Sequence, residues 1–247
     1  MQFTRNMLRI MKRELASYFE SPVAYVFLVV FLMLLGFFTF SVSNYYEAGQ
    51  ADLRGFFFWH PWVYLLLVPA ASMRLWAEER KSGTVELLLT LPVTMTQAIV
   101  GKFLAAWLFL TIALALTFPV VLTTMYLGNP DMGVVWGGYI GCILLAGTYL
   151  SVGMLASALT RNQVISFVLS LIGCLFLVLA GWPPVTRMLT EWAPDWLVTG
   201  VASFSVMPHF ESIQRGVLDL RDVGYYLSMI VVMLFATHLT IDNRKSS

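Results

Sequence analysis

The residues best able to do chemistry lie in one polar segment, residues 77–92, which separates two apolar stretches. Four charged residues stand near its start, and Gly83 permits a turn after them because glycine reaches backbone angles that other residues avoid. Thr84 can then cap a short helix with Glu86 in its first turn, where a negative charge suits the helix dipole. Pro92 disfavours helical geometry at the preceding residue and so ends this helix. The pattern predicts a surface helix for contact with a partner, or, alternatively, a loop that only folds onto the membrane surface.

A second helix start follows directly. Thr94 and Gln97 have the spacing of a capping box, in which each side chain accepts a hydrogen bond from the other residue's backbone N–H. The helix predicted from this point runs through Lys102 into the next apolar stretch. The polar segment is therefore joined closely to apolar elements on both sides, which suits contact with a partner protein.

Patterns for catalysis or cofactor binding are missing from the sequence. Gly101-Lys102 lacks both the upstream glycine and the following Ser or Thr of a phosphate-binding loop. H-E-x-x-H and G-x-S-x-G do not occur. Cys142 and Cys174 lie in apolar runs and are expected to be small buried side chains, neither disulfide-bonded nor metal-binding. We therefore expect no catalytic residue, metal or cofactor in this chain, and any ATP and Mg²⁺ would be bound by a partner.

The composition indicates a membrane protein. Of the 247 residues, 59% are apolar and 12% are charged, against about 45–50% and about 25% in soluble domains. So few charges cannot cover the surface of a soluble fold of this size, which excludes an ordinary soluble enzyme. A net charge of +1 also argues against nucleic acid as a partner.

Six stretches are apolar and long enough to cross a membrane as helices, for which about 20 residues are needed. They are residues 22–42, 57–76, 103–127, 134–159, 164–182 and 225–241. The connections between them are too short for a second domain. We therefore expect residues 1–247 to form a single all-α integral membrane domain.

The Lys and Arg residues between these stretches predict the orientation. With both termini in the cytoplasm, eleven of the fifteen Lys and Arg residues lie inside and four lie outside. Cytoplasmic connections of membrane proteins carry such an excess of basic residues. The fourteen acidic residues lean the other way, with eight outside and six inside.

Two segments outside the predicted spans are amphipathic at helical spacing. Residues 3–19 predict an interfacial helix attracted to anionic lipid, because basic residues lie opposite an apolar face of Leu8, Met11, Leu15, Tyr18 and Phe19. Before the last span, apolar residues recur every three or four positions and predict a helix on the outer leaflet, or alternatively a helix that only fills a gap in packing. These residues are Phe210, Ile213, Val217 and Leu220.

The spans themselves carry signals for packing. Gly133, Gly137 and Gly141 stand four apart in the fourth span, and small residues at this spacing let helices approach closely. Packing within the chain is the simplest prediction, and a contact between subunits is the alternative. In the third span, Pro119 predicts a kink.

The polar segment and its surroundings resemble the loop between the second and third spans of type-2 ABC exporter permeases. The matching residues are Glu79-Arg80, Gly83-Thr84, Glu86-Leu87-Leu88-Leu89, Leu91-Pro92-Val93 and Ile99-Val100-Gly101-Lys102. The six-span layout with a basic amphipathic N-terminus is also similar. Phe210, Arg215 to Val223 and Tyr225 to Ser228 resemble the gliding-motility (GldF-like) branch, which is close to permeases of nitrous-oxide-reductase maturation.

This resemblance implies a function. The inside loop would be a coupling helix that docks on a cytoplasmic ATPase subunit, and the segment before the last span would be an extracellular gate helix. A second permease copy, membrane lipid and an extracytoplasmic accessory protein are the other partners considered, in a bacterial inner membrane. The docking residues would be Glu79, Arg80, Gly83, Thr84, Glu86 and Leu87, and the gate residues Phe210, Ile213, Val217 and Leu220.

Two other functions stay open at this point. The chain could be a scaffold that moves nothing and anchors a partner or relays force. A secondary transporter is a weaker alternative, because the predicted span centres contain no Asp, Glu, Lys or Arg, which ion-coupled transporters commonly place there.

Overall fold

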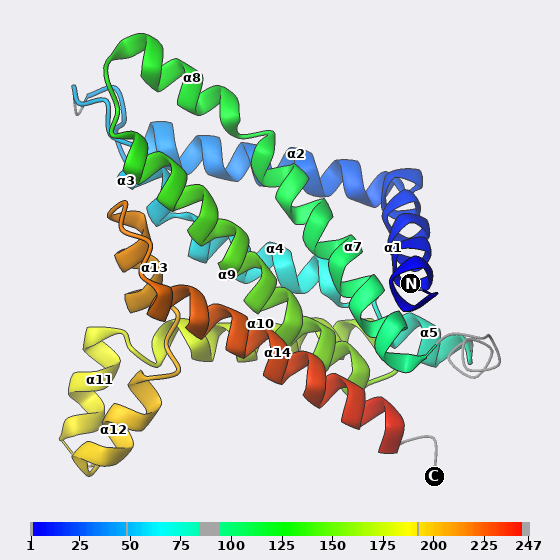
Figure 1. Ribbon diagram of the computed structural model, residues 1–247. Coiled ribbons are helices and arrows are strands. Elements are labelled where there is room, and N and C mark those ends of the chain that lie inside the picture. The colour runs from blue at the N-terminus through cyan, green and yellow to red at the C-terminus, as the bar shows by residue number, and fades with distance from the viewer. Residues whose placement is uncertain (1, 48, 84–93, 192, 244–247) are drawn as a thin grey trace.

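The computed structural model describes residues 2–47, 49–83, 94–191 and 193–243, and in these ranges the chain forms helices and no strands. The predicted all-α class is confirmed. Figure 1 shows the arrangement. The elements are α1 (Gln2–Glu20), α2 (Pro22–Phe37), the π-helical turn η1 (Phe38–Val42), α3 (Arg54–Phe58), α4 (His60–Ser72), α5 (Ala77–Ser82), α7 (Met95–Ala115), α8 (Phe118–Leu127), α9 (Met132–Leu159), α10 (Gln163–Leu179), α11 (Pro183–Thr190), α12 (Asp195–Ala202), α13 (Met207–Gln214) and α14 (Leu220–Asn243).

Five helical stretches of the described chain are long and apolar enough to cross a membrane, and there are six if one bent pair is a single span. The bent pair is α10 and α11, which meet at an angle of 78°. The predicted fifth span, residues 164–182, is therefore the one that falls short, because α10 ends at Leu179. Pro183 and Pro184 explain the break, since neither supplies the backbone N–H that a continuing helix needs.

The second and third spans are each built from more than one helix. Together α3, α4 and α5 form the stretch Arg54–Ser82, and α7 and α8 form Met95–Leu127. Pro119 lies in the first turn of α8, where the missing N–H costs no helical hydrogen bond. The predicted kink is thus present as a break between α7 and α8.

The central element is α9, which contacts α4, α7, α10, α13 and α14. Its small residues make these contacts close: a Cβ atom added to Gly153 would lie 2.0 Å from Ser72 Oγ of α4 and 2.8 Å from Ser170 Oγ of α10. At Gly147, an added Cβ atom would lie 2.9 Å from the indole nitrogen of Trp107 in α7. These glycines of α9 therefore let neighbouring helices of the chain approach closely.

The N-terminal helix α1 packs along α7. The Tyr18 ring stacks on Phe109 with centroids 4.9 Å apart, and Ile10 occupies the space left by Gly101. Four residues of the predicted apolar face are half-buried, namely Met11, Leu15, Tyr18 and Phe19, while the fifth, Leu8, is 44% exposed. Met7 and Ile10, which the prediction left out, are also half-buried, since the gap at Gly101 admits Ile10.

The two ends of the bundle differ in what they gather. In Figure 1, α1, α5 and the C-terminal end of α14 lie at one end, while α3, α13 and the loop between α8 and α9 lie at the other. The short helices α11 and α12 project beyond the bundle on the side of α13. The candidate sites predicted from sequence therefore fall at opposite ends of the molecule.

Candidate functional site

The polar segment begins as the short helix α5. Glu78 and Glu79 lie in its first turn and Arg80 and Lys81 in its last, an order that complements the helix dipole. Gly83 ends the helix in the left-handed region, with φ of 73°, so the predicted turn is confirmed. The remaining predicted docking residues, Thr84, Glu86 and Leu87, lie outside the described residues, as does the short helix predicted there.

The start of α5 is attached to α9 through a serine. The Ser157 hydroxyl accepts hydrogen bonds from the backbone N–H groups of Trp76 and Ala77, each at 3.0 Å, and donates to the carbonyl of Met73 at 3.0 Å. Helix starts leave N–H groups without intrahelical partners. Ser157 satisfies two of them in the bend between α4 and α5, which ties this bend to the end of α9.

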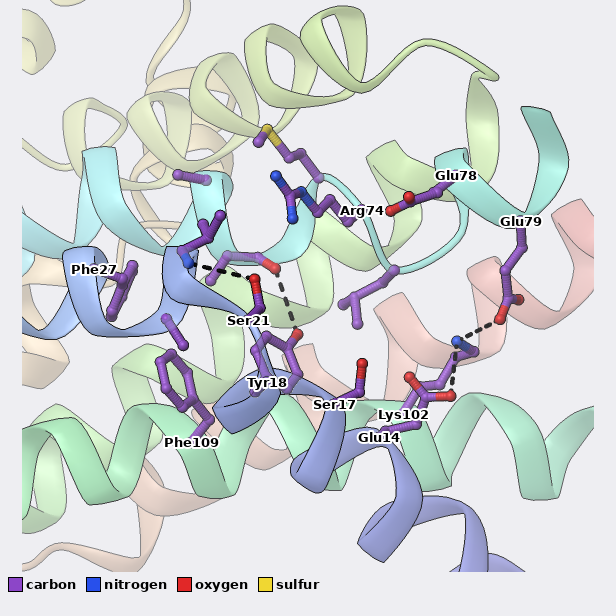
Figure 2. A pocket seen from close by; sticks show the side chains of 16 residues that line it. Glu14, Ser17, Tyr18, Ser21, Phe27, Arg74, Glu78, Glu79, Lys102 and Phe109 are labelled. Carbon is purple, nitrogen blue, oxygen red and sulfur yellow. Dashed lines mark hydrogen bonds and ion pairs between the residues drawn. The ribbon is translucent and has the colours of Figure 1, made fainter. Parts of the chain in front are cut away.

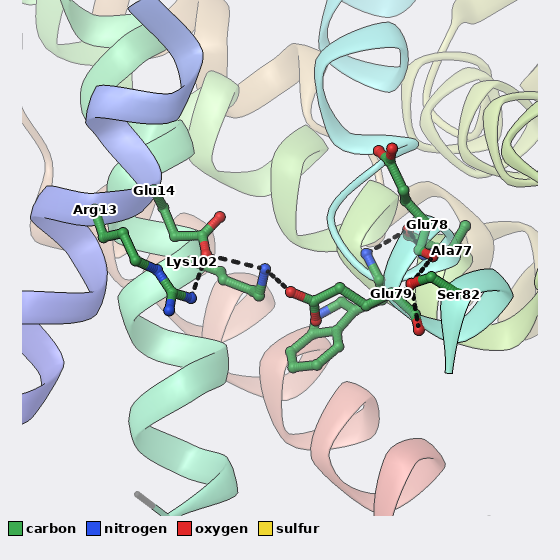
Figure 3. A network of polar contacts seen from close by, with 9 residues as sticks. Arg13, Glu14, Ala77, Glu78, Glu79, Ser82 and Lys102 are labelled. Carbon is green, nitrogen blue, oxygen red and sulfur yellow. Dashed lines mark hydrogen bonds and ion pairs between the residues drawn. The ribbon is translucent and has the colours of Figure 1, made fainter. Parts of the chain in front are cut away.

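A buried lysine attaches α5 to two further helices. Lys102 of α7 has 3% of its side chain exposed, and its Nζ lies 2.8 Å from Glu79 Oε1 and 3.3 Å from Glu14 Oε1 of α1 (Figure 3). The ammonium also lies 5.4 Å from the ring centroid of Trp76, which is fully buried. Two carboxylates and an aromatic face thus compensate the buried charge. Arg13 adds an ion pair to Glu14 at 3.1 Å.

Two of the predicted docking residues make contacts within the chain. The Glu79 carboxylate binds Lys102, and the Arg80 guanidinium donates to the carbonyl of Ala158 at the end of α9. Both predicted docking side chains are therefore engaged within the chain. On the exposed side of α5 lie Lys81, Ser82 and Gly83. The structure thus separates an outer surface of α5 from an inner set of side chains that bind α7 and α9.

The helix that follows the polar segment starts as predicted. Thr94 Oγ1 accepts from the backbone N–H of Gln97 at 3.3 Å, and Gln97 Oε1 accepts from that of Thr94 at 3.0 Å. This capping box begins α7. It places Lys102 two turns into the helix, level with Glu14 and Glu79.

A cavity of about 470 Å³ lies next to the lysine network. Its walls come from the junction of α1 and α2, the bend between α4 and α5, and α7 (Figure 2). The Tyr18 hydroxyl donates to the carbonyl of Ala71 at 3.5 Å across one wall. Burial and the nearby Glu14 carboxylate raise the pKa of Tyr18, so its phenol is protonated at neutral pH.

At the opposite end, the predicted gate residues divide into two pairs. Phe210 and Ile213 lie on α13 and are buried, at 1% and 0% exposure. Val217 and Leu220 are 64% and 85% exposed and lie beyond α13, which ends at Gln214. The prediction of one helix carrying all four residues is wrong. Gly216, with φ of +87°, turns the chain between the pairs.

The glycines of α9 explain why α13 sits where it does. A Cβ atom added to Gly137 would lie 2.5 Å from the carbonyl oxygen of Ile213, and one added to Gly141 would lie 3.3 Å from the Ile213 side chain. A Cβ atom at Gly133 would lie 3.8 Å from Gly216. The glycine stripe predicted from sequence therefore receives α13 and the turn after it.

Two side-chain pairs in the structure have no counterpart in the sequence predictions. His209 of α13 lies 2.7 Å from Asp222 of α14 and stacks on Tyr225, with ring centroids 4.1 Å apart. Lys102 and Glu14 form the other pair. No spacing rule joins residues so far apart in sequence. For Lys102, a cation directly before the apolar stretch 103–127 and on the same helix is the signal that calls for acidic partners.

The comparisons with known proteins point to one family. A family model described as an ABC-2 family transporter protein matches residues 63–239, which run from α4 to α14 and include α5, Lys102 and α13. A search among curated proteins found no match.

Proposed function

Because the chain belongs to the ABC-2 transporter family, we propose that it couples ATP hydrolysis by a separate ATPase subunit to export or rearrangement across a membrane. Members of this family are membrane components of ABC transporters, and the chain is accordingly a multi-pass permease component. Such permeases work with an ATPase subunit. Two further questions are where the ATPase subunit contacts the chain and how its movement reaches the membrane-spanning helices.

The observation that carries the proposal is the attachment of α5 to three other helices. Glu79 binds Lys102 of α7, Arg80 binds the end of α9, and Ser157 of α9 binds the start of α5. A push on the outer surface of α5 would therefore move α4, α7 and α9 together. Lys102 also binds Glu14, which extends the linkage to α1.

The distribution of basic residues indicates on which side of the membrane the ATPase would contact the chain. With both termini in the cytoplasm, eleven of the fifteen Lys and Arg residues fall in segments predicted to be cytoplasmic, and residues 77–92 form one of these segments. We infer that α5 faces the cytoplasm of a bacterial cell, where an ATPase can contact Lys81 and the residues after Gly83. In this scheme Glu79 and Arg80 transmit the movement instead of touching the ATPase.

The proposal also covers the assembly of the subunits and the end of the chain that contains α13. Two permease copies would pair with two ATPase subunits, and α13 would serve as the extracytoplasmic gate. Its support is that α13 rests on α9, the helix to which α5 is attached at the other end. The gliding-motility-like branch is proposed from the residues before the last span alone.

The test is co-purification and hydrolysis. The full chain is co-expressed with an ABC ATPase from the same genome, purified in detergent, and assayed for bound ATPase and for ATP turnover. We expect Lys81→Glu to reduce bound ATPase, and Glu79→Gln to leave binding largely intact while lowering the stimulation of turnover. The matched control is Arg187→Glu, which reverses a charge on α11 at the opposite end.

Two results would contradict the proposal. ATP hydrolysis by the purified chain alone would show that no separate ATPase subunit is needed. Binding of the ATPase that is unaffected by Lys81→Glu would remove α5 as the contact. A reconstituted complex that hydrolyses ATP and moves no lipid, peptide or glycan would favour the scaffold alternative.

A further inference from the structure

We propose that the cavity beside Lys102 binds a zwitterionic phospholipid, with a phosphate at Arg74 and a primary ammonium at Glu78. This goes beyond the proposed function, because it concerns a ligand of the permease chain itself and does not require the ATPase. Three features of the cavity support this ligand: its level in the membrane, the gradient of polarity along its walls, and two charged side chains that remain after the others pair.

The level of the cavity is set by the first span. Ser21 lines the cavity and caps the start of α2, its hydroxyl accepting from the backbone N–H of Val23 at 3.3 Å. The stretch that begins there, Pro22–Val42, is long and apolar enough to cross the membrane. The cavity therefore lies where a span begins, which is the depth of lipid headgroups.

The walls change from charged to apolar along the cavity. Figure 2 shows Glu14, Glu79 and Lys102 gathered on one side, with Phe27 and Phe109 on the other. The apolar side opens along α2, since Val23 lines the cavity and is 50% exposed. A headgroup could occupy the charged part while an acyl chain leaves along α2. A volume of about 470 Å³ lies within the range of small-molecule sites, about 300–1,000 Å³.

The charges left without partners define the headgroup. Of the ionisable side chains in the wall, Glu14 and Glu79 both bind Lys102. Arg74 and Glu78 also line the cavity, both are exposed, and neither side chain has a hydrogen bond or ion pair within the described parts of the chain.

One guanidinium and one carboxylate remain, and they match a ligand that carries one anion and one cation. Guanidinium binds phosphate oxygens in a bidentate manner, and a carboxylate accepts hydrogen bonds from a primary ammonium. A phosphoethanolamine headgroup supplies both groups. A phosphocholine headgroup has no N–H to donate, and a phosphoglycerol headgroup has no cation.

The experiment is native mass spectrometry of the full chain in detergent. The protein is offered equal amounts of phosphatidylethanolamine, phosphatidylglycerol and phosphatidylcholine with identical acyl chains, and the retained lipid is counted. We expect wild type to retain the ethanolamine lipid at least about threefold over the other two. Arg74→Gln should lower retention of all three by roughly fivefold. Glu78→Gln should lower only the ethanolamine lipid, to the level of the choline lipid.

The matched control is Arg9→Gln, which removes a cation from the exposed face of α1 outside the cavity. It should retain lipids as wild type does. Thermal unfolding of each variant checks that the fold is kept, which is expected because the Arg74 and Glu78 side chains make no hydrogen bond or ion pair among the described residues. Equal retention of the three lipids by wild type, or an Arg74→Gln variant that matches Arg9→Gln, would overturn the proposal.

A second arm separates the lipid from its headgroup. Soluble phosphoethanolamine, which has no acyl chain, is added at the concentration of the lipid. We expect no displacement, since the apolar part of the cavity adds to binding only when a chain fills it. Displacement at equal concentration would show that the headgroup alone is the ligand and would overturn the assignment to a phospholipid.

Discussion

The two ends of this molecule are held by different forces. At the end with α5, a buried lysine joins α1, α5 and α7 through two carboxylates. At the end with α13, glycines of α9 leave room for the backbone of α13 to lie against them. The junction at α5 is stabilised by a buried charge and its two counter-charges. The junction at α13 is stabilised by the close fit of two helix backbones.

This contrast has a consequence for movement. An ion pair has a defined length and direction, but its strength falls when water enters, so the α5 junction can respond to a load. A close backbone contact at a glycine is kept only while the two helices do not slide along each other. We infer that the end with α5 is suited to receive a signal, and that α13 moves only when α9 moves with it.

The largest expected effect is at the charged junction. Lys102→Met keeps the apolar stem but removes the buried cation between Glu14 and Glu79, so that Glu14 retains its pair with Arg13. We expect the free energy of unfolding in detergent to fall by about 3 kcal/mol, the low end for breaking a buried pair because both carboxylates keep some exposure. The measurement is denaturant unfolding, monitored through tryptophan fluorescence. Lys12→Met, on the exposed face of α1, is the control and should change little.

A smaller loss of stability is expected at the contact between α9 and α13, which depends on close packing at a glycine. In Gly137→Ala the added Cβ atom meets the carbonyl oxygen of Ile213 at 2.5 Å, and a backbone atom cannot move aside as a flexible side chain could. We expect a loss of about 2 kcal/mol in the free energy of unfolding.

The control for this variant is Gly36→Ala in α2, because an added Cβ atom there would have nothing within 4 Å. That substitution should be neutral or slightly stabilising, given the higher helix propensity of alanine. If both glycine variants behaved alike, the second junction would not depend on close approach, and the comparison between the two ends would fail.

The smallest effect tests whether charge also matters at the end with α13. His209→Gln removes the pair with Asp222 while the contact of Phe210 and Ile213 with α9 stays. We expect a loss of about 1 kcal/mol, typical of one hydrogen-bonded pair. Glu211→Gln, an exposed neighbour on α13, should have no measurable effect. A loss as large as that of Lys102→Met would mean that both ends are held by charge.

Local signals in the sequence located much of the fold. The apolar stretches located the first span at residues 22–42, and the Thr94–Gln97 capping box located the start of α7. The left-handed turn at Gly83 was also predicted, since few other residues adopt that backbone. These features depend on residues within a few positions of one another, which is why they could be found without a structure.

Other predictions failed or stayed incomplete because they depended on distant contacts. A helix through Phe210, Ile213, Val217 and Leu220 satisfied the periodicity, yet the chain turns at Gly216, which rests on α9. The predicted apolar face of α1 is half-buried except at Leu8, and it left out Ile10, which lies against Gly101 of α7. Periodicity cannot show how far such a face extends around a helix, because the gap at Gly101 belongs to another helix.

For the candidate site, the sequence determined the segment, and the structure decided which partners Glu79 and Arg80 contact within the chain. The types and order of residues 77–83 were enough to predict a charged, turn-ended element, and its position between two apolar stretches follows from hydropathy alone. That Glu79 and Arg80 face inward, onto Lys102 and Ala158, was decided only in three dimensions. The physical reason is that a buried cation must find anions, and which anions it finds depends on which helices packing brings beside it.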